Sequence, residues 1–192
     1  YDCGRAHERT GDIKGAIYWY KRVISKGDSN VEVAKIAGFM HDIGNAVNRK
    51  NHGEYGALLA DRILEKTDLP LEDRVTIVSA IGTHDESTGG AKDAVSAALI
   101  LADKADVRRS RVRNRDISTF DIHDRVNYAV FDSLLEISND EKMIKLTLKI
   151  DTQICPVMEY FEIFLERMVL CKKSAAFLGC DFELIINDTR LL

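Results

Sequence analysis

The chain has 192 residues, of which 45% are hydrophobic and 30% charged, and its formal net charge is -4. This composition is ordinary for a water-soluble globular protein, and a mildly acidic surface excludes any general attraction to nucleic acid or anionic membranes. No apolar run approaches the ~20 residues that span a bilayer, and no signal peptide is recognisable, so we expect no membrane partner.

Apolar residues recur at helical spacing through the first half of the chain. Alternating steps of three and four residues predict helices that bury one face. The first stripe consists of Ala6, Ile13, Ile17, Tyr20 and Ile24, with Thr10 filling the gap after Ala6. Further helices are expected over about residues 31–43, 51–63, 71–82 and 91–107. Gly44 is placed to end the second helix. Asn51, with Glu54 three residues later, predicts a capping-box-like start for the third.

The hydrophobic period changes after about residue 120. Apolar residues alternate with polar ones over residues 144–150, which is typical of a half-buried strand. The other expected elements are a strand near 128–137, a turn at Asn139-Asp140, a long helix over 157–178 that ends at Gly179, and a strand over 182–186. The sequence therefore predicts a mainly α protein, with a helical domain over residues 1–120 and a small α+β unit of β-β-α-β order over residues 121–192.

The cysteines Cys3, Cys155, Cys171 and Cys180 form no C-x-x-C pair. Their even number leaves disulfides open, but a chain of this length buries a core without them. We therefore expect reduced, partly buried thiols in a cytoplasmic protein.

Residues that can bind a metal stand at the ends of several apolar helices. His41-Asp42 ends the second helix, and Asp103 follows Leu99 by one turn on a buried face. His84 continues the face of the fourth helix, and His52 begins the third. Burying an ionised carboxylate is costly unless it is paired or bound to metal, so these side chains are expected to converge on one centre. Taken singly, each has a plainer interpretation, as a hydrogen-bonded histidine, a helix cap or half of an ion pair.

The segment Ala37-Gly38-Phe39-Met40-His41-Asp42-Ile43-Gly44 resembles the signature of the HD-domain metal-dependent phosphohydrolases. Further elements match in order. His52 precedes a helix of small residues. His84 ends a helix that contains Ala80 and Ile81, and Asp103 lies late in an apolar helix, directly after Ile100, Leu101 and Ala102. The resemblance covers roughly residues 5–115 and implies a helical HD-domain bundle.

The resemblance also implies a ligand set. His7, His41, Asp42 and Asp103 would hold one metal, and Asp42 would bridge to a second metal held by His52 and His84. The last two histidines make the chain similar to the dinuclear branches of the family, which include diadenosine tetraphosphate hydrolases and cyclic-dinucleotide phosphodiesterases. The short spacing from His41 to His52 departs from the second of these branches. The surroundings of His7 are not a close match, so an absent N-terminal ligand stays open.

Imidazole and carboxylate ligands suit a pair of Fe, Mn, Co, Ni or Zn ions. Two such ions can generate a hydroxide that attacks phosphorus in line. The expected activity is cleavage of a phosphoester or pyrophosphate bond in a small nucleotide-like substrate, with Asp42 among the catalytic residues. The alternatives are a non-catalytic nucleotide sensor or regulatory protein of the same fold, and a structural or interaction protein.

A phosphorylated substrate also needs cationic side chains. Many family members carry Lys three residues after the HD aspartate, where this chain has Asn45. Arg49 and Lys104 are expected to replace that Lys as catalytic and substrate-binding residues, and Asn45 is assigned to substrate binding. A basic cluster follows, formed by Arg108, Arg109, Arg111, Arg113 and Arg115. It is either a salt-bridged surface beside Asp106 and Asp116 or a phosphate-binding site to which Arg108 contributes.

The C-terminal unit carries no motif that indicates an activity. His123 repeats a His-Asp dipeptide but lacks the preceding apolar helix, so we interpret it as a structural residue. Two roles stay open for this unit: it can form a homodimer interface, or it can cover the metal site.

Overall fold

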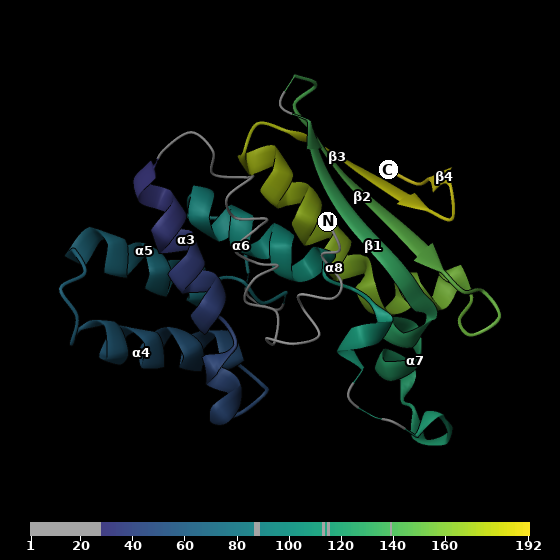
Figure 1. Cartoon of the computed structure of the whole chain (residues 1–192), viewed down its shortest axis with the longest axis horizontal. Coiled ribbons are helices and arrows are strands. Elements are labelled where there is room, and N and C mark those ends of the chain that lie inside the picture. The colour runs from purple at the N-terminus through teal and green to yellow at the C-terminus, as the bar shows by residue number, and fades with distance from the viewer. Residues whose placement is uncertain (1–27, 87–88, 113, 115, 139) are drawn as a thin grey trace. The chain divides into compact units, whose positions relative to one another are not determined.

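The computed structural model describes residues 28–192, apart from residues 87, 88, 113, 115 and 139. The chain divides into two compact units, Tyr1–Asp103 and Lys104–Leu192 (Figure 1). The helix expected over residues 6–24 lies outside the described residues. The assignment of residues 1–120 and 121–192 to separate domains stays a prediction, because a division by compactness does not test where a functional domain ends.

The described part of the first unit is built from helices, as the hydrophobic period predicts. They are α3 (Asp28–Met40), the 3-10 helix η1 (Ile43–Ala46), α4 (His52–Leu64), α5 (Leu71–Gly82) and α6 (Ala94–Ala105), the last of which continues into the second unit. Helix α3 ends earlier than expected, so His41 and Asp42 lie in the turn between α3 and η1.

The predicted stripes form the core of this unit. Its buried residues come from α3, α4, α5 and α6: Val33, Ala34, Ala37, Met40, Ala60, Leu64, Ile77, Ala80, Ile81, Val95, Ala98, Leu99 and Ala102. Each fully buried Val, Leu or Ile contributes roughly 1.5–3 kcal/mol relative to an exposed one. The alanines shorten the distance between helices, so the helix ends that carry the polar residues lie close together.

The start of α4 was predicted correctly, but its cap was not. Helix α4 begins at His52, directly after Asn51. Asn51 has a left-handed backbone conformation with φ 61°, and its side chain makes no capping hydrogen bond. A capping box needs an N-cap residue with extended backbone, from which the side chain reaches the third amide of the helix. The left-handed conformation removes that geometry.

Gly44 and Gly56 allow the turn after α3 to lie directly against α4. A Cβ atom at Gly44 would stand 2.0 Å from the carbonyl oxygen of His52 and 2.5 Å from the amide nitrogen of Gly56. A Cβ atom at Gly56 would stand 3.2 Å from the carbonyl oxygen of His41. At Gly44 only glycine permits this approach, whereas a Cβ atom at Gly56 would require the neighbouring atoms to shift slightly. The contact joins the two segments that carry His41 and His52.

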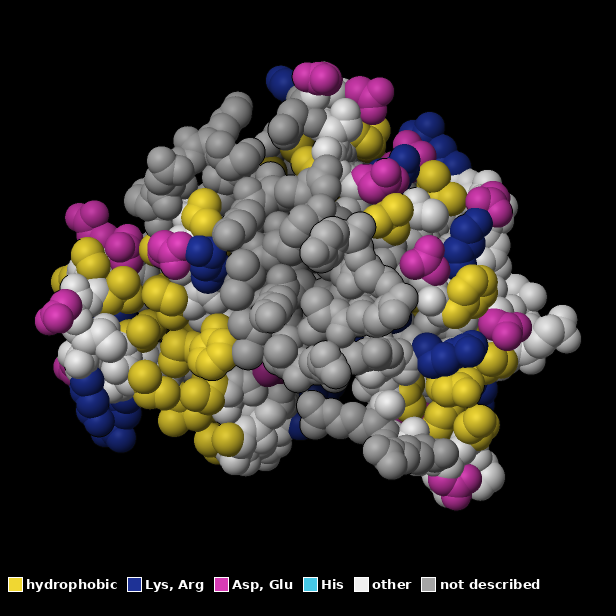
Figure 2. Space-filling model, viewed as in Figure 1, with side chains coloured by type: hydrophobic (Ala, Val, Ile, Leu, Met, Phe, Trp, Pro, Cys, Tyr) yellow, Lys and Arg dark blue, Asp and Glu magenta, His cyan; other side chains and the backbone are white. Residues whose placement is uncertain are grey.

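The first unit also leaves large hydrophobic side chains exposed. In Figure 2, hydrophobic side chains gather over α3 and the neighbouring helices of this unit. The most exposed of them are Phe39, Val47, Leu58, Leu71 and Val75. The described helices therefore do not bury all the apolar surface that they carry.

The second unit combines helices with one mixed sheet. Its elements are the 3-10 helices Arg109–Arg111 and Ile117–Thr119, α7 (Ile122–Ala129), β1 (Val130–Ser138), β2 (Met143–Ile150), α8 (Val157–Phe177), β3 (Asp181–Ile186) and β4 (Thr189–Arg190). The strand order is β1-β2-β3-β4. β1 pairs with β2 and β3 with β4 in antiparallel fashion, and β2 pairs with β3 in parallel through the crossover helix α8 (Figure 1).

The expected β-β-α-β order is confirmed in this unit. The buried sides of β2 and β3 face the buried side of α8, and the residues concerned are Ile144, Leu146, Leu148, Phe182, Leu184, Tyr160, Phe164 and Met168. Two details differ from the expectation. Helix α7 occupies the residues before Val130, so β1 begins later than predicted. The two-residue strand β4 is too short to show a hydrophobic period.

We expect Gly44→Ala to lower the melting temperature strongly, because the new methyl group must push the backbone of α4 away from η1. Overpacking of this kind costs roughly 1–3 kcal/mol or more. Gly90→Ala is the matched control, since a Cβ atom there meets no atom within 4 Å. Thermal unfolding followed by circular dichroism measures both. Equal melting temperatures for the two variants would show that the close approach at Gly44 is unimportant.

Candidate metal centre

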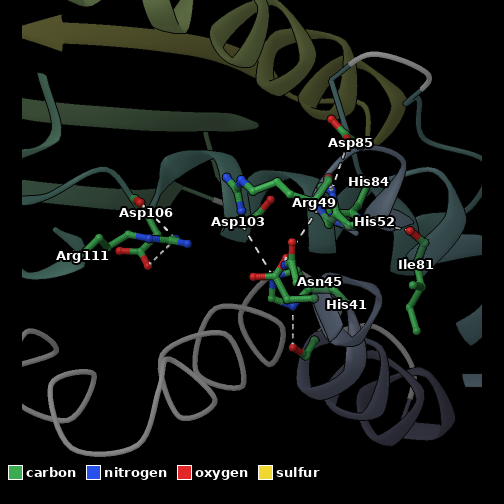
Figure 3. Close-up of polar contacts among 12 residues, drawn as sticks. His41, Asn45, Arg49, His52, Ile81, His84, Asp85, Asp103, Asp106 and Arg111 are labelled. Carbon is green, nitrogen blue, oxygen red and sulfur yellow. Dashed lines mark hydrogen bonds and ion pairs between the residues drawn. The ribbon is translucent and has the colours of Figure 1, made fainter. Parts of the chain in front are cut away.

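The residues of the candidate site converge from separate segments of the first unit (Figure 3). His41 and Asp42 lie in the turn after α3, and His52 is the first residue of α4. His84 follows the end of α5, and Asp103 lies in the last turns of α6. The convergence expected from the sequence is therefore present for these five residues.

A backbone carbonyl of the preceding turn fixes the ring of each of these histidines. The Nδ1 atom of His41 lies 2.8 Å from the Gly38 oxygen, that of His52 lies 3.1 Å from the Arg49 oxygen, and that of His84 lies 2.6 Å from the Ile81 oxygen. A carbonyl oxygen can only accept, so Nδ1 is the donor in each case. In a neutral ring the proton on Nδ1 leaves the Nε2 lone pair available to a ligand.

The Nε2 atoms point toward one another and toward the carboxylates. Nε2 of His52 lies 3.1 Å from Nε2 of His84. Nε2 of His41 lies 3.6 Å from an oxygen of Asp42 and 3.7 Å from an oxygen of Asp103. Asp42 is also 3.5 Å from Nε2 of His52, so its carboxylate stands between two histidines. Two lone pairs held this close repel each other unless a proton or a cation lies between them.

Burial and charge both shape the site. The side chain of Asp103 is only 8% exposed, whereas that of Asp42 is 46% exposed and leaves an approach from solvent. Burial alone would lower the pKa of His41, but the interaction with the side chain of Asp103 and the negative charges of Asp103 and Asp42 raise that pKa to about 9. The carboxylates therefore create a strongly negative potential where the imidazoles converge, which favours a bound cation.

A further carboxylate supports His52. The side chain of Asp85 places an oxygen 3.3 Å from Nδ1 of His52, on the side opposite to the converging Nε2 atoms. Carboxylates that contact the outer nitrogen of a ligating histidine fix its orientation and increase its basicity. Asp85 was not among the residues expected at this site. The available signal was its position directly after the candidate ligand His84.

Asn45 contacts the site through Asp42. Its side-chain nitrogen donates to an oxygen of Asp42 over 2.9 Å. Within the part of the chain that the structure describes, the side-chain oxygen of Asn45 is buried and accepts no hydrogen bond. Asn45 thus orients Asp42 and offers one unused acceptor, while its predicted contact with substrate stays a prediction.

The cationic candidates have different surroundings. Arg49 is exposed, and Figure 3 draws its side chain pointing in the direction of Asp103. Lys104 is buried and belongs to the second unit. The roles assigned to both residues in substrate binding and catalysis stay predictions.

The described part of the basic cluster is engaged in contacts within the second unit. Arg108 and Arg111 form ion pairs with Asp106, at 2.7 Å and 3.0 Å. Arg109 donates to the carbonyl oxygen of Tyr128 over 2.7 Å, and its guanidinium lies 4.4 Å from the centre of the Tyr128 ring. These contacts favour the salt-bridged surface over a phosphate site. Arg113 and Arg115 lie outside the described residues, as does the expected ligand His7.

The donor set fits a divalent transition-metal ion. Ligand atoms of His41, Asp42 and His84 all lie within 4.8 Å of one another, so a single ion can be reached by all three after small side-chain movements. The Nε2 atoms of His52 and His84, 3.1 Å apart, add two further nitrogen atoms that can face an ion. Mixed imidazole and carboxylate ligands suit Mn, Fe, Co, Ni and Zn.

Comparison with known proteins gives one match. A family model described as HD domain matches residues 6–126. Searches among curated proteins and among solved structures gave no significant match. Among the described residues, the helices are too short or too polar to cross a membrane.

We expect His84→Ala to lower the affinity for Mn²⁺ or Zn²⁺ at least ~10-fold, because the variant removes one of the converging Nε2 atoms. His123→Ala is the matched control, since this exposed histidine lies in α7 of the second unit. Calorimetric titration of the chelator-treated proteins measures the affinity, and circular dichroism checks the fold. Equal affinities in the two folded variants would exclude His84 as a ligand.

Proposed function

The chain belongs to the HD-domain family, and on this basis we propose that it is a metal-dependent phosphohydrolase that cleaves a phosphoester or pyrophosphate bond of a nucleotide-like substrate. One observation carries the proposal: the histidines are held by Nδ1, so that their Nε2 atoms face each other and two carboxylates. This arrangement suits a metal site, because hydrogen bonds at Nδ1 leave the Nε2 lone pairs directed at a common point where an ion can bind.

Two ions are proposed. His41, Asp42 and Asp103 would hold the first, with His7 as a further ligand, and Asp42 would bridge to a second held by His52 and His84. The distances of Asp42 to His41 and to His52 support its bridging position. Such ions, drawn from Fe, Mn, Co, Ni or Zn, lower the pKa of coordinated water and polarise a phosphoryl oxygen.

The protein's own side chains contribute positioning and charge. Asn45 restrains one oxygen of Asp42, and Asp85 restrains the ring of His52. The partial exposure of Asp42 leaves room for a substrate to approach the bridging position. Arg49 and Lys104 are proposed to bind phosphate oxygens and to stabilise the charge that develops there during cleavage. The direction of the Arg49 side chain in Figure 3 supports its part of this role.

A non-catalytic nucleotide sensor is the second candidate function. It is favoured by Asn45, which stands where many family members carry a phosphate-binding Lys and is engaged with Asp42. A sensor would bind nucleotides without releasing phosphate or nucleotide products, so a hydrolysis assay separates the two candidates.

The remaining features of the proposal come from the sequence. The proposed substrate is a small phosphorylated or nucleotide molecule, and the chain is expected to work in the cytoplasm with no membrane partner and no general nucleic-acid binding.

The metal-loaded protein should hydrolyse at least one member of a panel of nucleotides, dinucleotides and cyclic nucleotides. Asp42→Asn should lower kcat/KM for that substrate at least ~100-fold, a loss of ~2.7 kcal/mol, because the amide is a poor bridging ligand. Asp68→Asn, an exposed carboxylate of the same unit, is the control. Phosphate release and chromatography of products provide the measurement. Nucleotide binding without turnover would instead support the sensor.

We expect Arg49→Met and Lys104→Met to retain metal, and at least one of them to lower kcat/KM roughly 10- to 100-fold, which is ~1.4–2.7 kcal/mol. The reason is the loss of a cation beside the transferred phosphoryl group. Lys50→Met is the control, since this exposed neighbour of Arg49 has no proposed role. Steady-state kinetics and elemental analysis test this together. Wild-type kinetics in both variants would remove the two residues from the site.

A further inference from the structure

Helix α8 carries a stripe of exposed side chains, four of them apolar and two charged, on the side that does not face the sheet. The stripe consists of Met158, Glu162, Leu165, Val169, Lys172 and Ala176, all of which are exposed. Leu165, at its centre, is 54% exposed. Successive members are separated by alternating steps of four and three residues, which is the spacing of a coiled-coil seam. A helix that only covered the sheet of its own unit would be expected to carry polar residues at all of these exposed positions. Met158, Leu165 and Val169 are instead large and apolar.

The stripe is symmetric about the point midway between Leu165 and Val169. Counting outward from that point, Leu165 matches Val169, Glu162 matches Lys172, and Met158 matches Ala176. If two such helices lie antiparallel about a two-fold axis through this point, each pair meets across the seam. The central pair is apolar, and the flanking pair brings opposite charges together twice.

We propose that α8 is a homodimer interface, at which it packs antiparallel against α8 of a second copy of the chain. The charges select this orientation. An in-register parallel pair would set Glu162 against Glu162 and Lys172 against Lys172, which is repulsive. In the antiparallel pair, Glu162 faces Lys172 of the partner subunit, and such charge complementarity fixes register more than it adds affinity. Self-complementary surfaces of this kind form two-fold dimers.

The size of the seam predicts a reversible dimer. From Met158 to Ala176 it is ~27 Å long at 1.5 Å per residue. One helix pair of this length buries less than the ~1,600 Å² of a standard interface, so the dissociation constant is expected in the micromolar range. This inference does not depend on the metal site, and a failure of either leaves the other standing.

The first experiment measures mass in solution as a function of concentration by sedimentation equilibrium. The wild-type chain should move from 21.6 kDa toward twice that mass over the micromolar range. Leu165→Glu should weaken dimerisation at least ~10-fold, since it buries a charge at the centre of the seam. Phe177→Glu is the matched control, because Phe177 is a similarly exposed apolar residue of α8 that lies outside the stripe. Circular dichroism confirms that both variants fold.

The second experiment tests the register. Glu162→Lys and Lys172→Glu should each weaken the dimer, because each places like charges opposite one another. The double variant should restore it to near the wild-type constant. A monomeric wild-type protein overturns the proposal, and would indicate that another part of the same chain covers the stripe. A dimer that is unaffected by Leu165→Glu, or a double variant that adds the two single losses, overturns it as well.

Discussion

The candidate site depends on the close approach of two backbones at Gly44 and Gly56. The turn after α3 carries His41 and Asp42, and the start of α4 carries His52. A side chain at Gly44 would overlap the backbone of His52 itself, so the distance between these segments is set by the absence of Cβ atoms. The spacing from Asp42 to His52, and with it the bridging position proposed for Asp42, follows from this contact.

The second constraint is a local hydrogen bond that recurs at three histidines of the site. Each histidine donates from Nδ1 to a carbonyl oxygen three residues earlier in its own chain segment: His41 to Gly38, His52 to Arg49, and His84 to Ile81. The ring direction is therefore set before any ion binds, and Asp85 reinforces it at His52. Asp42 and Asp103 add the negative potential that raises the pKa of His41. Together these side chains form a group that could hold a cation, with Asp42 partly exposed to solvent.

Much of this arrangement could be predicted from the sequence, because helices with one buried face leave a periodic signal. The described helices of the first unit, the β-β-α-β order, and the convergence of His41, Asp42, His52, His84 and Asp103 all follow from that period together with the family resemblance. The pattern could not show contacts formed by single polar atoms. The role of Asp85 depends on its single contact with Nδ1 of His52. At the start of α4, the sequence pattern predicts that the Asn51 side chain caps the helix, but Asn51 has a left-handed backbone and makes no capping hydrogen bond. The sequence of an arginine-rich segment also does not show which carboxylates its side chains pair with. In the structure, Arg108 and Arg111 form ion pairs with Asp106.

The central claim is that the converging imidazoles and carboxylates bind metal. The most direct measurement is anomalous diffraction from crystals grown with Mn²⁺ or Zn²⁺, recorded on both sides of the absorption edge of the metal. The account predicts anomalous density within ~2.0–2.3 Å of Nε2 of His41 and of oxygens of Asp42 and Asp103, with a second peak beside His52 and His84. Anomalous density elsewhere, or a metal-soaked crystal in which these side chains contact no metal, would contradict it.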